Sequence, residues 1–421
     1  MADSVFSLNR NLSYRLSSMV QDLSGAAAAE LRSNPPPESR NPLRIVITAN
    51  EVNGLHGTGP LVKRICRGWT NVVSIRARND WGGEQDFGDW KMCLLQRARS
   101  RVDFFGQILA SLRGRSIAQV LCVPFLRDDF LTAIAVQKSF GAKLCGYIMD
   151  DQNVASSAVP DDLMREFLEC CSLRLCTHPE LQAAYEKKYG LVFHLLPAVV
   201  PSHLIADEVA PAPEPGRRGA LLCSFWDQSW FERLCTALAP AKFEIDWFGN
   251  NKSPWVEFDA RLMERAGIRP HGIIPEERLA DALKAYPFVI VPAAPLDGSE
   301  SNPGVARLSL PGRILFATAV SHTPVLVVGS DATCGARFVH HFGVGESAPY
   351  DARKILESME RISQPDLQAA MRRRAAQISG ALSDQGAGEW LQASIDLGRP
   401  ADDRFIRIFD EYGGRRSAVW A

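Results

Sequence analysis

The stretch SESNPGVARLSLPGRILFATAVSHTPVLVVG, residues 299–329, contains in order the three kinds of segment that decide the fold. It opens with a loop rich in Ser, Gly and Asn. The part LPGRILFATAVS has the apolar spacing of a helix, and TPVLVVG is a short β-branched run typical of a buried strand. A helix that begins after such a loop presents unpaired backbone N–H groups, and Arg313 lies at its start. This arrangement is suited to binding a diphosphate.

The same alternation of apolar runs and helical stretches continues through most of the chain. Runs such as RIVITA (44–49) and AKLCGYIM (142–149) are separated by helices of about 10–15 residues, which indicates parallel βαβ units and an α/β fold. The Pro-rich stretch EVAPAPEPGRRG (208–219) cannot pack into a core and divides the pattern in two. The predicted organisation is an N-terminal extension 1–41, an α/β domain 42–200, a linker 201–219, a second α/β domain 220–390 and a tail 391–421 that packs back on the body.

Composition narrows the function classes. The 421 residues include 47 Lys and Arg against 48 Asp and Glu, a net charge of −1, which argues against a nucleic-acid partner. No stretch approaches the ~20 apolar residues of a membrane span, and the N-terminus lacks the regions of a signal peptide. We expect a cytoplasmic protein. The N-terminal segment and the cluster Arg372–Arg374 offer two ways to contact the inner membrane face peripherally, although an arginine triplet is more often a solvated surface.

The ten cysteines show no CxxC pair and no zinc spacing, and most lie in apolar runs. We interpret them as reduced core residues. The neighbouring pair His340 and His341 has no partner ligands at metal spacing. The sequence therefore predicts no metal.

Three further places can carry chemistry. Gly57, Thr58 and Gly59 follow a predicted strand and precede a helix, but the spacing is neither a dinucleotide-binding nor a P-loop motif. They form either a ligand loop or a flexible turn.

Asp150 and Asp151 come directly after the predicted strand 142–149. Carboxylates at the carboxyl end of a parallel strand can bind sugar hydroxyls or act as a base. Neighbouring strand residues point to opposite faces, so at most one aspartate aims at a ligand; the alternative is a cap or turn. His178 follows a predicted strand and is either a cleft residue or a cap.

The succession of SLPGRI (309–314), TPVLVVG (323–329) and FVHHFGVG (338–345) resembles the donor-site region of GT-B glycosyltransferases, particularly those related to family four. IRPHGII, with His271 and Gly272, resembles the turn that precedes the donor loop of that family. The resemblance covers roughly residues 43 to 390, and the order of the motifs carries it.

The resemblance implies a GT-B fold of two facing Rossmann-like domains with an interdomain cleft and a C-terminal helical segment. It implies transfer of a sugar from a nucleotide diphosphate donor to a glycan, lipid-linked or small-molecule acceptor, with retention of configuration and no bound metal or other cofactor. Asp150 or Asp151 would orient the acceptor hydroxyl, and Gly57, Thr58, Gly59 and His178 would line the acceptor side. The donor-binding residues would be Ser309, Leu310, Pro311, Gly312, Arg313, Ser224, Gln228, His271 and Gly272.

Two departures from the family pattern keep alternatives open. Phe316 and Ala317 stand where family-four enzymes place a ribose-binding glutamate, and Ser224, Gln228 and Ser229 replace the basic residues after the first strand of the second domain. A non-catalytic GT-B-like partner subunit of an active glycosyltransferase is therefore the alternative. A nucleotide-sugar epimerase is a third interpretation, but we find no convincing acid/base pair for it.

Overall fold

The computed structural model describes residues 41–49, 51–76, 84–94, 101–209, 211, 213, 216–225, 227–252, 256–299 and 307–413. Most of the expected N-terminal extension, parts of the expected linker and tail, and the loop 300–306 lie outside these residues. The described chain forms two compact units. Unit 1 runs up to Ile148 and adds Ala158–Leu175 and Ala387–Ala401; unit 2 takes in Met149–Ser157, Cys176–Gly386 and the chain from Asp402. Residues 149–157 and 176–200, which we expected in the first domain, thus belong to unit 2, and residues 387–390, which we expected in the second, belong to unit 1.

The first sheet has the strand order β3-β2-β1-β4-β5-β6-β7. β1 pairs in parallel with β2 and β4, and the strand LRIVI of β1 is almost wholly buried, as the apolar run predicts. The strands are β1 (Leu43–Ile47), β2 (Val72–Arg76), β3 (Trp90–Cys93), β4 (Ile117–Cys122), β5 (Lys143–Ile148), β6 (Leu173–Cys176) and β7 (His194–Leu195). The helices of unit 1 are α3 (Thr58–Ile65), α4 (Arg101–Leu112), α5 (Arg127–Phe140), α6 (Asp161–Cys170) and α16 (Ala387–Leu397).

The second sheet has the order β10-β9-β8-β11-β12-β13, and all of its pairs are parallel. Its strands are β8 (Arg218–Leu222), β9 (Glu244–Phe248), β10 (Ile268–Gly272), β11 (Val289–Pro292), β12 (Val325–Val328) and β13 (Gly345–Ala348). The helices of unit 2 are α7 (Pro179–Tyr189), α8 (Gln228–Leu238), α9 (Ala260–Arg265), α10 (Glu276–Leu283), α12 (Gly312–Val320), α13 (Cys334–Phe342), α14 (Ala352–Ile362), α15 (Pro365–Ser379) and α17 (Arg404–Gly413).

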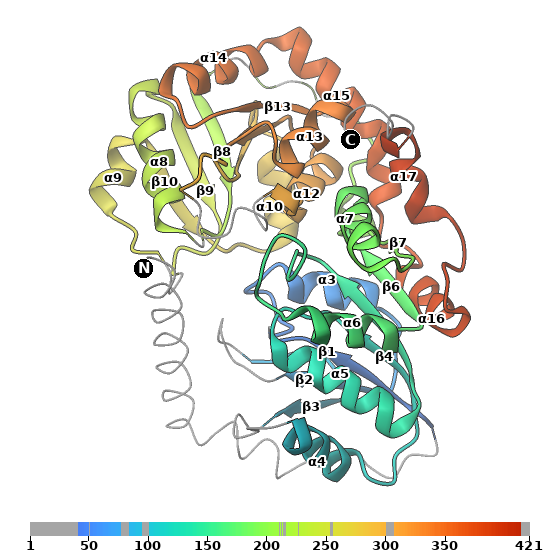
Figure 1. Ribbon diagram of the computed structural model, residues 1–421. Coiled ribbons are helices and arrows are strands. Elements are labelled where there is room, and N and C mark those ends of the chain that lie inside the picture. The colour runs from blue at the N-terminus through green and yellow to red at the C-terminus, as the bar shows by residue number, and fades with distance from the viewer. Residues whose placement is uncertain are drawn as a thin grey trace. The chain divides into compact units, whose positions relative to one another are not determined.

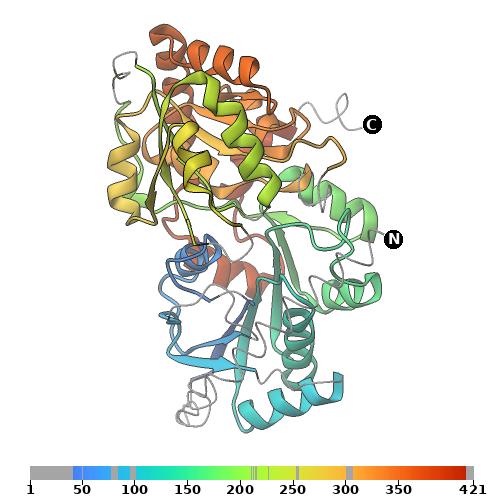
Figure 2. The same ribbon diagram turned by 90° about the vertical axis from the view of Figure 1, so that its left-hand side faces the viewer.

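Alternate residues of the central strands build two cores on opposite faces of the second sheet. Val289 and Val291 pack with α10, α12 and α13, whereas Ile290 packs with α8 and α14. This follows from the two-residue period of a strand. Both ribbon views show helices on the two faces of this sheet (Figure 1 and Figure 2). The continuous β-branched runs of the sequence are the consequence of burial on both faces.

The helix α15 corrects one expectation about the surface. Arg372 is fully buried and donates to the carbonyl oxygens of Tyr286 at 2.8 Å and Ser321 at 3.2 Å. The prediction that residues 372–374 form an exposed cluster is therefore wrong for Arg372.

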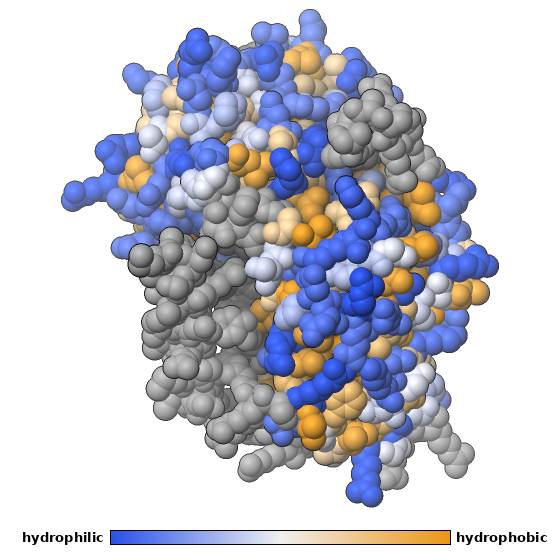
Figure 3. Space-filling view, viewed as in Figure 1, coloured by the Kyte–Doolittle hydropathy of each residue, from blue (hydrophilic) through white to orange (hydrophobic). Residues whose placement is uncertain are grey.

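The exposed large hydrophobic side chains lie singly along the described chain. On the side of unit 2 that is in view, hydrophobic residues are scattered among hydrophilic ones (Figure 3). Among the described residues, no helix combines the length and apolar character needed to cross a bilayer.

Candidate active site

Both sheets reverse their strand order at one point. When the strands of each sheet are numbered from one in chain order, the first six strands of the first sheet lie in the order 3-2-1-4-5-6. All six strands of the second sheet lie in the same order. The reversal falls between β1 and β4 in the first sheet and between β8 and β11 in the second. Ligands of open parallel sheets bind outside the carboxyl ends of the strands at this reversal. The carboxyl end of β8 is therefore where a ligand of unit 2 is expected.

The start of α12 meets that end of β8. Pro311 is the N-cap of α12 in an extended conformation and makes no side-chain cap, so the first N–H groups of the helix have no capping side chain. Arg313, in the first turn, donates from Nη1 to the carbonyl oxygen of Leu222 at 3.3 Å. Burial lowers the pKa of Arg313, and neighbouring Cys223 and Asp150 oppose this shift. The helix start and one partly buried cation thus converge at the predicted ligand position.

Asp150 joins this group from the segment after β5. Its Oδ1 accepts a hydrogen bond from the Ser309 hydroxyl at 3.1 Å, across 159 residues of sequence. Burial raises the pKa of Asp150; the Ser309 hydrogen bond and Arg313 act against it, and Asp151 adds to it. A half-buried carboxyl with a raised pKa, beside a hydroxyl and a guanidinium, can hold a substrate hydroxyl and accept its proton.

Asp151 has a different role from its neighbour. Its side chain is fully buried, and its two oxygens accept the backbone N–H groups of residues 153–156 at 2.7–3.0 Å. Tyr185 donates a further hydrogen bond to Oδ1 at 3.2 Å. The carboxylate is thus used to shape the loop, which matches the turn alternative of the sequence analysis. Of the two aspartates, the geometry favours Asp150 for chemistry.

The residues expected after the first strand of the second domain mainly hold loops. Gln228 accepts from the Glu257 N–H at 2.8 Å and donates to its carbonyl oxygen at 3.2 Å. The Ser224 hydroxyl accepts from the Asn250 N–H at 3.4 Å. Asp227, which the sequence analysis did not single out, caps α8 through the N–H groups of its first turn. Gln228 therefore has little hydrogen-bonding capacity left for a nucleotide-sugar ligand.

His271 lies at the end of β10 and remains 44% exposed. Its Nε2 bonds Asp246 Oδ1 at 2.7 Å, and its ring stacks on Phe248 with a centroid distance of 5.0 Å. Burial raises the pKa of Asp246, but hydrogen bonds outweigh it and hold that pKa below the ordinary value; they come from His271, Tyr286 and Arg218. Gly272 has φ +71°, a left-handed turn that glycine favours. This network orients the imidazole firmly.

The glycine loop of unit 1 lies after β1, beside the reversal of the first sheet. Gly57 is the N-cap of α3 and Thr58 its first residue. A Cβ at Gly59 would lie 2.1 Å from the Asn53 carbonyl oxygen, so this glycine allows a close backbone approach. These three residues belong to unit 1, whereas the other candidate residues belong to unit 2.

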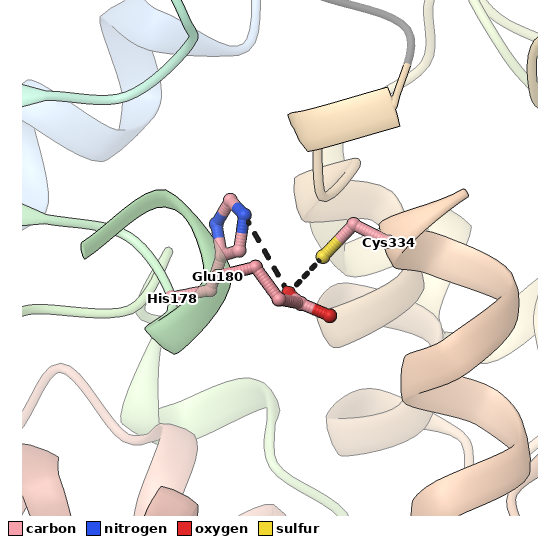
Figure 4. A group of neighbouring side chains, drawn as sticks. All are labelled: His178, Glu180 and Cys334. Atoms are coloured by element: carbon pink, nitrogen blue, oxygen red, sulfur yellow. Dashed lines mark hydrogen bonds and ion pairs between the residues drawn. The ribbon is translucent and has the colours of Figure 1, made fainter. Parts of the chain in front are cut away.

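His178 is the N-cap residue of α7 and is buried. Burial lowers the pKa of its imidazole, while Glu180 and the backbone of Leu308 act in the opposite direction. It lies beside Glu180 and, from α13, Cys334 (Figure 4). The sequence analysis named only His178 of this group; the spacing His178-Pro-Glu180 at a helix start was the available signal.

Phe316, which stands where family-four enzymes place a glutamate, lies in apolar surroundings in the structure. Phe316 is only 8% exposed and packs into the core around α12. Leu310 lies at the edge of the same core. Nothing in the described part of α12 therefore replaces the ribose-binding glutamate of family four.

Comparison with solved structures agrees with this topology. WaaG, a glycosyltransferase involved in lipopolysaccharide biosynthesis, matches with a TM-score of 0.56 and 13% identity over 84% of this chain and 99% of that one. Anabaena HepE, solved in complex with UDP, matches with 0.58 and 11% identity over 84% and 100%. A UDP-N-acetylglucosamine 2-epimerase matches with 0.52 and 13% identity over 85% and 97%. No protein-family model and no curated protein sequence matches the chain.

At 11–13% identity, these structural similarities are evidence for the fold alone. Together with the two parallel sheets, they show that the chain has the GT-B fold, with two Rossmann-like domains. The expected fold class is confirmed at this level. Since a transferase and an epimerase share the fold, activity must be argued from the site.

Proposed function

We propose that this protein is a glycosyltransferase that moves a sugar from a nucleotide diphosphate donor to an acceptor hydroxyl. The observation that carries the proposal is the meeting of Arg313, the α12 start and the pair Ser309–Asp150 at the carboxyl end of β8. The donor would bind in unit 2. A relation to family four, retention of configuration, a cytoplasmic location and action without a cofactor belong to the same proposal and rest on the sequence analysis.

In this mechanism, cleavage of the sugar–phosphate bond builds negative charge on the leaving diphosphate. The uncapped N–H groups of α12 and the Arg313 guanidinium stabilise that charge. Asp150 holds and orients the acceptor hydroxyl, and the proton of that hydroxyl passes to the departing diphosphate, as a reaction with retention requires. Ser309 fixes the carboxyl orientation through its hydrogen bond to Oδ1.

A non-catalytic partner subunit is the second candidate because of Phe316. An apolar, buried side chain at this point removes a hydrogen-bond acceptor for the ribose. Such a protein would bind nucleotide weakly and would act through a complex with an active enzyme.

The first test is a calorimetric titration with UDP, GDP and ADP. We expect one nucleotide to bind at micromolar strength to the native chain and about 10–100-fold more weakly to Arg313→Ala, since a charge-assisted hydrogen bond is worth about 1.5–3 kcal/mol. Arg361→Ala is the matched control, because Arg361 is an exposed arginine paired with Glu346. Equal binding by both variants would remove Arg313 from the donor site.

The second test separates the activity classes. The nucleotide sugar of the preferred base is incubated with the protein, and the products are followed by NMR. Release of the nucleoside diphosphate with transfer to an added acceptor supports the transferase. A change of configuration within the intact nucleotide sugar would assign an epimerase, and absence of both binding and turnover would favour the partner subunit.

A further inference from the structure

Three metal-ligating side chains meet inside unit 2. His178 and Glu180 come from the start of α7, and Cys334 is the first residue of α13 (Figure 4). His178 and Cys334 are 1% exposed and Glu180 is 7% exposed. One ligand atom from each, nitrogen, oxygen and sulfur, lies within 4.8 Å of the other two. Buried polar side chains need partners, so the question is what holds these three together.

The hydrogen bonds of Thr177 suit the tautomer in which Nδ1 of His178 carries the proton. The Thr177 hydroxyl donates its only proton to the Met149 carbonyl oxygen at 3.2 Å. With that bond made, the hydroxyl oxygen can accept from Nδ1–H of His178, which lies 2.8 Å away. The lone pair of the neutral ring is then on Nε2. This atom is buried without a hydrogen-bond partner and lies 3.8 Å from Glu180 Oε2.

Glu180 is held in a corresponding way. Its Oε1 accepts from Arg337 Nε at 3.0 Å, and its Oε2 accepts from the Cys334 thiol at 2.5 Å and lies 3.8 Å from His178 Nε2. In this tautomer the lone pair of Nε2 and the oxygen Oε2 point toward the same buried place, which the Cys334 thiol also faces (Figure 4). A proton or a metal ion between acceptors relieves that repulsion, and Thr177 and Arg337 are the outer partners that orient a metal-binding His and carboxylate.

We propose that His178 Nε2, Glu180 Oε2 and Cys334 Sγ bind a thiophilic divalent cation of the Zn²⁺ class. On binding, the S–H bond of Cys334 gives its proton to water and an S–metal bond forms, so one proton is released per ion. Thiolate and carboxylate together balance the two charges of the ion. Arg337 keeps its own charge near water, since its side chain is 21% exposed.

The distances suit this ion with one adjustment. Zinc bonds of about 2.0–2.3 Å in a tetrahedral arrangement hold ligand atoms roughly 3.3–3.8 Å apart. The His178–Glu180 separation of 3.8 Å already fits, and Cys334 Sγ must move about 1 Å away from Glu180. Three protein ligands leave a fourth position for water.

The ion would be a structural clamp beside the candidate active site. It would join the start of α7 to the start of α13, while Thr177 connects the same cluster to Met149, next to Asp150. This inference stands on the cluster itself and does not require the proposed transferase activity. It departs from the sequence prediction of no metal, which rested on spacing along the chain and on the resemblance to GT-B enzymes.

The test starts from the full chain, stripped of metal and titrated with Zn²⁺ or Co²⁺. We expect uptake of about one equivalent, a thiolate-to-Co²⁺ charge-transfer absorption, and a rise in the thermal midpoint with Zn²⁺ that a chelator reverses. His178→Ala and Cys334→Ser should lose the absorption and the rise. Cys235→Ala, which removes a buried thiol of α8 outside the cluster, should keep both.

Cys334→Ser also distinguishes the clamp from a closed hydrogen-bond cluster. Serine retains a hydroxyl that can donate to Glu180, so a purely hydrogen-bonded cluster would leave the variant as stable as the native chain in every metal condition. A native chain that shows no Co²⁺ absorption and no Zn²⁺-dependent midpoint would overturn the proposal. Unchanged absorption in Cys334→Ser would overturn it too, because the thiolate would then come from elsewhere.

Discussion

Unit 1 and unit 2 share a strand order but differ in the side chains at its reversal. In unit 1 the acids beside the reversal are buried against protein groups: Asp129 accepts the N–H groups of Phe125 and Leu126 at 2.9 and 3.0 Å, and Glu51 lies 4.0 Å from Arg76. In unit 2, Asp150 and Arg313 are only partly buried. One topology can therefore carry a packed turn or a reactive site, depending on which polar groups keep hydrogen-bonding capacity.

The largest effect is expected from Asp150→Asn in unit 2. Asparagine keeps an oxygen that accepts from Ser309 but loses the charge with which Asp150 holds the acceptor hydroxyl, so sugar transfer should fall by roughly 10²–10³-fold. Stability should stay equal or rise, because burial raises the pKa of this carboxyl and makes its charged form costly. Turnover measurements check the predicted loss of sugar transfer, and urea unfolding of the same samples checks the predicted stability. Retained turnover would show that another group holds the acceptor hydroxyl.

The next effect concerns the glycine of unit 1. Gly59→Ala brings a Cβ to 2.1 Å from a backbone carbonyl oxygen that cannot rotate away. We expect a loss of about 3 kcal/mol in the free energy of unfolding, well above the roughly 1 kcal/mol that alanine adds to a helix. Urea denaturation measures it. A stable variant would show that the loop 51–55 can shift and that the packed-turn description is too rigid.

A smaller effect is predicted for the pH dependence of unit 1. Burial raises the pKa of Asp129 to about 7, and the N–H groups of Phe125 and Leu126 only partly oppose this. Since the folded value exceeds the unfolded value near 4, this group's stabilisation is complete below about pH 4 and is lost as the pH rises through about 7. Asp129→Asn, which keeps the acceptor, should become progressively more stable than the native chain between pH 5 and pH 8. A stability difference between Asp129→Asn and the native chain that stays the same at all pH values would contradict the raised pKa of Asp129.

The smallest stability effect is expected at the glycine of unit 2. A Cβ at Gly312 would meet only Ala198, at 3.4 Å, so Gly312→Ala should change the free energy of unfolding by less than about 1 kcal/mol in either direction. If a diphosphate binds the start of α12, the added methyl group should still weaken nucleotide binding. Calorimetry measures the change in nucleotide binding, and urea unfolding measures the change in stability, so the two effects can be separated. Together with Gly59→Ala, this variant tests whether one glycine serves packing and the other access.

Local patterns predicted the α/β class and most strands, because burial on both faces leaves a visible β-branched run such as VLVV of β12. They did not reveal β3 or α4, whose sequences are less regular. They also could not separate Asp150 from Asp151, since this depends on the backbone direction after β5. Glu180 and Cys334 lie 154 residues apart, and only the packing of α7 against α13 brings them together. Arg372 shows the same limit, because an arginine triplet does not indicate which member faces the core.

Neither unit is made from one continuous piece of chain, and this affects synthesis on the ribosome. Unit 1 is completed by Ala387–Ala401, where the Gly388 carbonyl oxygen accepts from the indole of Trp69 and the Gln392 carbonyl oxygen accepts from Gln119. Unit 2 needs Ile408 and Phe409 for its core. A nascent chain must therefore wait for its last segments before either half closes. Premature termination near residue 386 would leave both units without the segments that complete them.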